Sequence, residues 1–310
     1  MRLKMQLLSK IDKKALECFP FPHAVIDDFL PANLCNKLIE TYPDIEAIDP
    51  RAKENNFRFL YNMKDSQKDE RISKEWKETL EYLSSPESFY EISSFFKEEL
   101  LKRYPSTFKS EKQIKNLKVG IRGIHSYLTK DVLLDAQVRG NTGDMNPSCV
   151  QGAHIDAGIK IYSGLLYLRP ENDDTKGGDL EVRELTPKEL YKLSDKQKAL
   201  KFYKSGAYID PKYTKINKRV PYSKNTLFLF VNSLDSIHSV AERAPTKYTR
   251  KFIGFTAEMR KPLFLAQPTL KNRFQLLKNE YKFFIASSKL EIYNALSNIA
   301  WLKHIYKRLK

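Results

Sequence analysis

The motif with the clearest chemical potential is a histidine and an aspartate separated by one residue, His154 and Asp156 in GAHIDAGIKIYSGLLYL. Alternate residues of an extended chain point to the same side, so both side chains can face one point. A further histidine, His238, follows the apolar run NTLFLFV after a short polar connection. If that run forms a neighbouring strand, two imidazoles and one carboxylate meet on one face.

Such a set of ligands suits a metal ion. Two imidazoles and one carboxylate take one face of an octahedral ion and leave three positions open, as in non-haem Fe(II) oxygenases. Zinc with the same ligands and one water is the main inorganic alternative. Read alone, the His-x-Asp tripeptide is more typical of a strand-end histidine beside a solvated carboxylate, so other residues must decide between these interpretations.

A basic residue and a pair of glycines extend the pattern. Arg250 stands in YTRKFIGFTAEM, where a strand leaving the metal would carry it to the far end of a pocket. An arginine there can bind a carboxylate through two N–H groups. Arg243 is closer in sequence but lies in the turn AERAPTK, so Arg250 is the preferred candidate. Gly177 and Gly178, in GGDLEV, permit a tight turn after the apolar strand.

The order of these features resembles the iron(II)/2-oxoglutarate-dependent dioxygenase superfamily, in particular its prolyl 4-hydroxylase-like branch. The resemblance spans about residues 118–258 and comprises H-x-D, the YL strand, GGDL, the NTLFLF strand, the second histidine and the following basic residue. The stretch PFPHAVIDDFLP also resembles the opening strand and helix of many bacterial members. The resemblance implies an α+β chain with a mainly β core, a double-stranded β-helix (jelly roll) with flanking N- and C-terminal helices.

The resemblance also implies roles for particular residues. The iron ligands and catalytic centre would be His154, Asp156 and His238. Arg250 matches the residue that holds the C5 carboxylate of 2-oxoglutarate. Tyr167 matches a position that supports the same carboxylate in some members, and Tyr127 matches a position that touches the co-substrate. The expected cofactors are Fe(II), 2-oxoglutarate and O₂, with ascorbate as reductant.

The implied activity is hydroxylation of an unactivated C–H bond, coupled to conversion of 2-oxoglutarate and O₂ into succinate and CO₂. The remaining histidines are expected outside this chemistry. His125 is interpreted as structural or as a neighbour of the site, His23 as a packed or surface side chain, and His304 as a residue of the helical tail.

Periodicity predicts the elements that position these residues. Residues 24–26 form a predicted short strand before a helix whose apolar side includes Leu34, Leu38 and Ile39. The block from Ile72 to Tyr104 has apolar residues three and four apart, which predicts core-facing helices. From Lys118 the period changes, and the predicted strands are VGIRGIHSYLT, IKIYSGLLYL, NTLFLFVNS and RKFIGFTAEM.

Two segments are strongly basic. Residues 183–224 hold 12 Lys/Arg and 4 Asp/Glu, a balance of +8, and interrupt the β region as a lid or binding loop would. Residues 260–310 hold 11 Lys/Arg and 2 acidic residues, a balance of +9. The expected organisation is a dioxygenase domain over 1–260, with helical support in 1–117 and the jelly roll in 118–260, followed by a basic helical extension over 261–310.

Composition bounds the partners and the compartment. The net charge of +16 and the pI of about 9.5 favour an anionic partner. Three cysteines without a C-x-x-C pair are typical of a reducing cytoplasm. Neither a signal peptide nor an apolar run long enough to span a bilayer is evident. We expect a cytoplasmic protein. The basic C-terminal tail is interpreted as a solvated helix end, with peripheral contact at the anionic inner face of the membrane as the alternative.

The charge also directs the expectation about substrate. The preferred class is an anionic glycan or glycolipid, as a carbohydrate or lipopolysaccharide precursor such as a 3-deoxy-octulosonic acid unit. A peptidyl (prolyl-type) residue or a small metabolite is the alternative. In another class, the chain would be a non-catalytic nucleic-acid or membrane-surface binding protein on an oxygenase scaffold, although no nucleic-acid motif is present. The long basic insertion and the 26 residues between Tyr127 and His154 depart from the compact family pattern.

Overall fold

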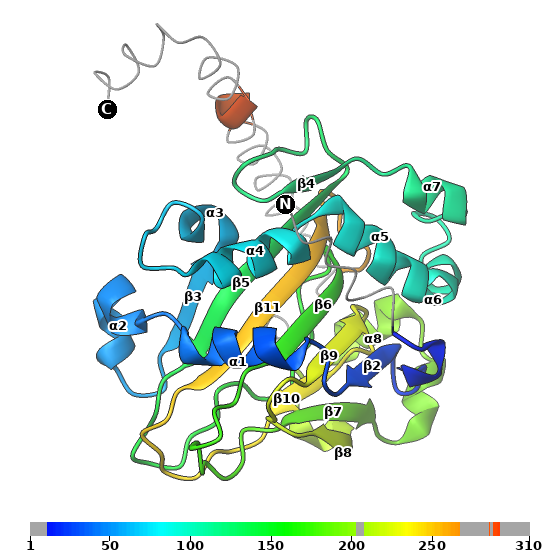
Figure 1. Ribbon diagram of the computed structural model, residues 1–310. Coiled ribbons are helices and arrows are strands. Elements are labelled where there is room, and N and C mark those ends of the chain that lie inside the picture. The colour runs from blue at the N-terminus through cyan, green and yellow to red at the C-terminus, as the bar shows by residue number, and fades with distance from the viewer. Residues whose placement is uncertain (1–10, 203–207, 267–284, 286–287, 292–310) are drawn as a thin grey trace, which may run out of the picture.

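Two mostly antiparallel β-sheets face each other, and helices cover the outer side of the larger sheet (Figure 1). The computed structural model describes residues 11–202, 208–266, 285 and 288–291 of the 310-residue chain. The fold is thus α+β with a jelly-roll core and flanking helices on the N-terminal side, as the sequence predicts.

The larger sheet has the strand order β1-β2-β9-β6-β11-β5-β3, and β4 pairs with β5 in parallel. The strand bounds are β1 Leu16–Glu17, β2 His23–Ile26, β3 Arg58–Asn62, β4 Val119–Ile121, β5 Val132–Asn141, β6 Lys160–Tyr167, β9 Leu227–Val231 and β11 Arg250–Met259. The long strands β5 and β11 pair along their whole length, from Arg250 opposite Asn141 to Met259 opposite Val132. They form the longest strand pair of this sheet.

The smaller sheet has the order β10-β7-β8. Its strands are β7 Leu180–Leu185, β8 Thr214–Val220 and β10 His238–Val240. The chain leaves the larger sheet at the end of β9 and enters the smaller sheet at β10 after six residues. This crossing carries His238 to the inner side of the jelly roll.

The helices begin where the sequence supplies caps. Ser73 and Ser85 accept hydrogen bonds from the backbone N–H groups of Trp76 and Ser88 at the starts of α4 and α5. The α-helices are α1 Ala32–Glu40, α2 Ile45–Ile48, α3 Met63–Ser66, α4 Lys74–Leu83, α5 Pro86–Phe95, α6 Lys97–Arg103, α7 Glu111–Lys115 and α8 Asp195–Phe202. The 3-10 helices are η2 Lys13–Ala15, η3 Pro50–Lys53, η4 Lys188–Lys192 and η5 Pro211–Tyr213.

The two faces of the larger sheet are chemically different. On β11, Ile253, Phe255 and Ala257 join the apolar core under the helices, where Trp76 is fully buried. The intervening residues of β11 face the smaller sheet, and Phe252 is among the apolar residues that hold the two sheets together. This alternation follows from the two-residue period of a strand.

The helical and strand predictions are confirmed for most segments, with one correction before the metal motif. In VGIRGIHSYLT only residues 119–121 form a strand, because Gly123 has φ +78° and the N–H of His125 turns back to the carbonyl of Ile121. The long strand β5 follows, and the apolar periodicity misses it because its inner face carries polar residues. Most of the 26 residues before His154 therefore belong to β5 and the loop that leaves it.

The basic insertion 183–224 is less of a loop than the sequence suggests. Its two ends complete β7 and supply β8, which pair from Leu180 opposite Val220 to Leu185 opposite Thr214. Between them lie η4, α8 and η5. Lys198 of α8 is buried and contacts Asp235 at 2.7 Å. A role of this segment as a lid or binding element stays a prediction.

No helix in the described part of the chain combines the length and the apolar character needed to cross a membrane. The expected basic helical extension, 261–310, falls mostly outside the described residues. The domain divisions at residues 117 and 260, and contact of the tail with an anionic membrane, therefore stay predictions.

The glycine pair of GGDLEV provides a test of the fold. Gly177 has φ +79°, and a Cβ atom there would collide with the carbonyl oxygen of Glu242. We expect Gly177→Ala to lower the free energy of unfolding by roughly 2–3 kcal/mol in denaturant titrations. Gly152→Ala is the matched control, since no atom lies within 4 Å of a Cβ at that position. Equal stability of the two variants would contradict this account of the turn.

Candidate metal centre

Three potential metal ligands meet between the two sheets: His154, Asp156 and His238. His238 starts β10, and His154 lies in the loop that leads to β6. Two backbone hydrogen bonds join the histidines, from His154 N to His238 O at 3.0 Å and from His238 N to His154 O at 2.9 Å. The ring centroids lie 4.2 Å apart, and one ligand atom from each of the three residues lies within 4.8 Å of the others.

Both imidazoles are oriented by backbone carbonyls. His154 Nδ1 lies 2.8 Å from Gly152 O, and His238 Nδ1 lies 2.9 Å from Ser236 O. A carbonyl can only accept, so Nδ1 carries the hydrogen and Nε2 keeps its lone pair for a metal. Burial, reinforced by the neighbouring His238, lowers the pKa of His154 to about 3, and burial also lowers the pKa of His238. Both rings are therefore held in the neutral form that ligates metals.

One oxygen of the Asp156 carboxylate, Oδ2, is held by neighbouring side chains. Ser163 Oγ donates to Asp156 Oδ2 at 2.6 Å, Asn232 Nδ2 donates to Ser163 Oγ at 3.0 Å, and Lys160 Nζ lies 3.2 Å from the same carboxylate oxygen. Burial opposes ionisation of Asp156, but the charge of Lys160 and the Ser163 hydrogen bond outweigh it and hold its pKa below the usual range. These contacts use Oδ2 and leave Oδ1 to face the histidines.

This donor set fits a divalent metal with open coordination positions. Two neutral ring nitrogens and one carboxylate oxygen are the three-residue set of non-haem Fe(II) oxygenases, and the described residues offer no fourth ligand to the group. The same donors also satisfy a catalytic zinc ion that retains one water.

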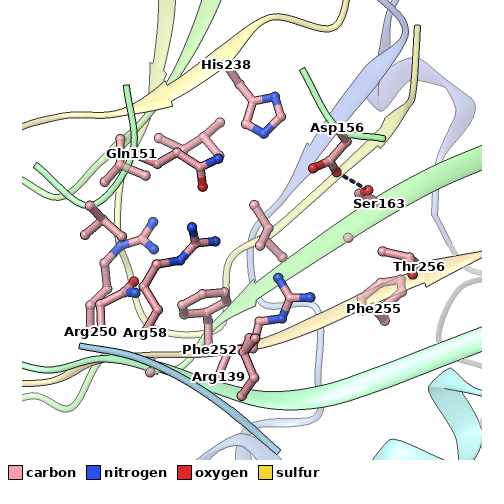
Figure 2. Close-up of a pocket in the computed structure, with 18 of the residues that line it drawn as sticks. Arg58, Arg139, Gln151, Asp156, Ser163, His238, Arg250, Phe252, Phe255 and Thr256 are labelled. Carbon is pink, nitrogen blue, oxygen red and sulfur yellow. Dashed lines mark hydrogen bonds between the residues drawn. The ribbon is translucent and has the colours of Figure 1, made fainter. Parts of the chain in front are cut away.

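The metal ligands open onto a cavity of about 220 Å³. His238 and Asp156 lie on one side of this space, and the guanidinium groups of Arg58, Arg139 and Arg250 point into it from the other (Figure 2). The cavity thus has a metal-binding side and a cationic side, which suits a small acid that bridges the two.

Arg250 is held rigidly on the cationic side. It is 3% exposed, its Nε donates to Gly178 O at 2.8 Å, and its Nη2 donates to Tyr167 OH at 2.9 Å. Nη1 has no hydrogen-bond partner within the described residues, so it can meet a carboxylate. Arg243 differs, because its guanidinium donates to the carbonyls of Asn141, Thr142 and Tyr248 and so supports the fold.

Of the two tyrosines that the sequence suggests, Tyr167 contacts Arg250, whereas Tyr127 lies away from the cavity. Tyr167 is fully buried behind Arg250 and contacts its guanidinium without lining the cavity, so its contribution is to position that arginine. Tyr127 lies in a turn before β5 and does not line the cavity, so its expected contact with a co-substrate does not agree with the structure. The expectation placed the strand before His154 at residues 118–128, whereas β5 occupies that place in the fold.

Several residues of the site were not predicted from the sequence. They are Arg58, Arg139, Lys160, Ser163 and Asn232. The available signal was the alternation of polar residues in DAQVRGN, which is the β5 pattern of a strand with one polar face. Lys160 and Ser163 lie only four and seven residues from Asp156, but nothing in the polar pattern there indicates their contact with it, and Asn232 is distant in the sequence.

The other histidines are not brought to the centre. His23 is buried with Nδ1 2.8 Å from Phe21 O, and His125 accepts a hydrogen bond from Ile121 N at 3.0 Å within its turn. His304 lies outside the described residues. The basic insertion does reach the centre, since Ile209 N donates to Ala153 O at 3.1 Å and the rings of Tyr208 and His154 are 6.0 Å apart.

No protein-family model matches the chain, and no curated protein sequence matches it either. Among solved structures, it is similar to a prolyl 4-hydroxylase from Phytophthora capsici, with 15% identity, 98% of this chain and 92% of that chain covered, and a TM-score of 0.43. It is also similar to a viral collagen prolyl hydroxylase from Paramecium bursaria Chlorella virus-1, solved with 2-oxoglutarate, with 13% identity, coverage of 77% and 96%, and a TM-score of 0.35.

A further similar structure is an Fe(II)/α-ketoglutarate-dependent dioxygenase, with 15% identity, coverage of 76% and 82%, and a TM-score of 0.37. The likeness is one of fold. These proteins are of the superfamily whose motifs the sequence resembles, but identities and TM-scores this low carry no conclusion about activity. The function proposed below therefore rests on the metal ligands and the cavity.

The hydrogen bond from Ser163 provides a test of the centre. We expect Ser163→Ala to weaken Fe(II) or Mn(II) binding roughly 10- to 100-fold, because the carboxylate of Asp156 loses the donor that orients it. Metal affinity is measured by anaerobic titration calorimetry. Ser233→Ala is the control, since Ser233 Oγ is also buried but accepts from Asp235 N instead of contacting a metal ligand. Equal affinities in the two variants would contradict a role of Ser163 at the metal.

Proposed function

We propose that the protein is an Fe(II)- and 2-oxoglutarate-dependent dioxygenase that hydroxylates an unactivated C–H bond. The observation that carries this proposal is the pairing, within one cavity, of a three-residue metal site with the buried and incompletely bonded guanidinium of Arg250. A dicarboxylic co-substrate needs both a metal and a fixed cation, and the cavity offers one on each side.

The residues of the site would have two roles, metal binding and co-substrate binding. His154, Asp156 and His238 would hold the iron, and Arg250, braced by Tyr167, would anchor the far carboxylate of 2-oxoglutarate. When bound, iron and 2-oxoglutarate supply the oxidising power by consuming O₂ and releasing succinate and CO₂. Apolar side chains that line the cavity, among them Phe230 and Phe252, exclude water from this space.

The preferred substrate class is an anionic carbohydrate or lipopolysaccharide precursor, such as a 3-deoxy-octulosonic acid unit. Support comes from the +16 net charge and from the additional arginines of the cavity. A peptidyl, prolyl-type residue or a small metabolite is the alternative. We place the reaction in the cytoplasm, where an anionic precursor at the inner face of the membrane is within reach.

The primary test needs no knowledge of the substrate. Anaerobic titration with Fe(II) and then with 2-oxoglutarate should produce the weak visible charge-transfer band of their complex, and Asp156→Ala should remove it together with all succinate formation above background. Asp174→Ala is the control because Asp174 is exposed and does not line the cavity. Binding of zinc without the band, or normal turnover by Asp156→Ala, would refute the proposal.

Arg250 has a separate prediction. We expect Arg250→Gln to bind Fe(II) normally but to weaken 2-oxoglutarate binding about 10- to 100-fold, since a charge-assisted contact worth about 1.5–3 kcal/mol is lost. The titration of the charge-transfer band measures both constants. An unchanged constant for 2-oxoglutarate would show that another cation anchors the co-substrate, whereas loss of Fe(II) binding would show that the variant has disturbed the metal site itself.

A further inference from the structure

Two arginines of the cavity have no part in the roles described so far. Arg58 lies on β3, the edge strand of the larger sheet, and Arg139 lies on the adjacent β5. Arg58 pairs with Asn141, two residues from Arg139, so the two arginines are diagonal neighbours on the same face. Figure 2 shows both guanidinium groups directed into the space beneath His238 and Asp156.

Arg139 is oriented from behind by a chain of hydrogen bonds. Its Nε donates to Gln137 Oε1 at 3.0 Å, and Gln137 Nε2 donates to Asp135 Oδ2 at 2.7 Å. A Cβ atom on Gly254, across the sheet, would lie 2.5 Å from Arg139 Nε, so the absence of a side chain there makes room for the guanidinium. These contacts fix the Nε side of the group, and its two terminal amino groups, which have no hydrogen-bond partner among the described residues, can face the cavity.

Basic side chains outnumber acidic ones in the lining of the cavity. Four basic residues line the cavity, Arg58, Arg139, Lys160 and Arg250, but Asp156 is the single acidic residue that does so within the described chain. Asp156 is paired with Lys160 and would also ligate the metal. Burial lowers the pKa of Arg139, which means that its charge is held there at an energetic cost. An anion in the cavity would offset that cost.

The co-substrate does not account for both arginines. In the proposed function, one carboxylate of 2-oxoglutarate meets the metal and the other meets Arg250, so Arg58 and Arg139 remain. Arg58 and its strand neighbour Leu60 are both exposed and both line the cavity. Arg58 therefore lies where the cavity meets solvent. A second anionic group would therefore arrive from outside with the molecule that is to be hydroxylated.

We propose that Arg58 and Arg139 form a binding site for an oxyanion, a carboxylate or a phosphate, carried by the prime substrate. This inference rests on the proposed function and adds the place where the substrate's charge is recognised. The pair would hold the anionic group on the cationic side of the cavity, and so direct a neighbouring carbon atom of the substrate toward the metal ligands.

The test uses full-length protein with Mn(II) in place of iron, saturated with 2-oxoglutarate, and inorganic phosphate as the probe. A phosphate bound near Mn(II) gives a strongly enhanced ³¹P relaxation rate. We expect this enhancement in the wild type, and an apparent phosphate affinity at least about tenfold weaker in the double variant Arg58→Gln/Arg139→Gln, because charge-assisted contacts are lost. Arg139→Lys should bind phosphate with intermediate affinity, since it keeps the charge but loses the planar fork.

The control for the loss of two positive charges is the double variant Lys13→Gln/Lys74→Gln, whose lysine side chains are 61% and 81% exposed. It should behave as the wild type. Enhancement that persists in the double variant would show that phosphate binds the metal directly, and the absence of enhancement in the wild type would show that no oxyanion site exists. Either result would overturn the inference.

Competition then identifies the source of the oxyanion. Displacement of phosphate by 3-deoxy-octulosonic acid, but not by its methyl ester, would support a carboxylate, and displacement by a sugar phosphate alone would support a phosphoryl group. Displacement by none of these compounds would make inorganic anion the only ligand and would overturn the assignment to a substrate.

The same samples separate this inference from the proposed function. If the wild type fails to bind Mn(II) or 2-oxoglutarate, the proposed function fails first. If both bind and Arg139→Gln alone weakens 2-oxoglutarate as strongly as Arg250→Gln does, Arg139 belongs to the co-substrate site and the inference fails while the function stands.

Discussion

The pair of backbone hydrogen bonds between His154 and His238 is the contact on which the site depends. It ties the loop before β6 to the first residue of β10, and so fixes the distance between two imidazoles that are far apart in the sequence. Each ring then has one nitrogen occupied by a carbonyl two residues earlier in the chain. The neutral form and the direction of both rings follow from main-chain geometry, before any metal is present.

Across the cavity from the two histidines, the turn at Gly177 and Gly178 holds Arg250 in place. Gly177 and Gly178 both adopt φ +79°, which lets the turn approach Arg243 and lets Gly178 present its carbonyl to Arg250. Glycine at position 178 therefore serves the turn and also the placement of the Arg250 guanidinium. Arg250 begins β11, which pairs with β5 from that residue on and with β6 from Phe252 on, so strand pairing also fixes the backbone that carries the guanidinium.

The inner face of the larger sheet departs from an ordinary apolar core. This face contains Asp135, Gln137 and Arg139 in alternate positions of β5, together with Ser163 on β6 and Thr256 on β11. Polar groups in such a place are tolerated only when they are bonded or serve a ligand. Some are bonded to one another, and the guanidinium groups of Arg139 and Arg250 face the cavity.

The sequence by itself determined the local features. Strand and helix periodicity, the caps of α4 and α5 and the spacing of His154 and Asp156 all depend on neighbours in the chain. The need for glycine at 177 is different, because it arises from the close approach of Glu242 O. Tertiary structure alone decided which distant residues share the cavity. Tyr127 was misplaced because β5, polar on its inner face, did not read as a strand, and Arg58, Arg139 and Ser163 gained their places only through strand register. These strands pair with partners far away in the chain and are not joined to them by tight turns, so the local pattern did not specify their register.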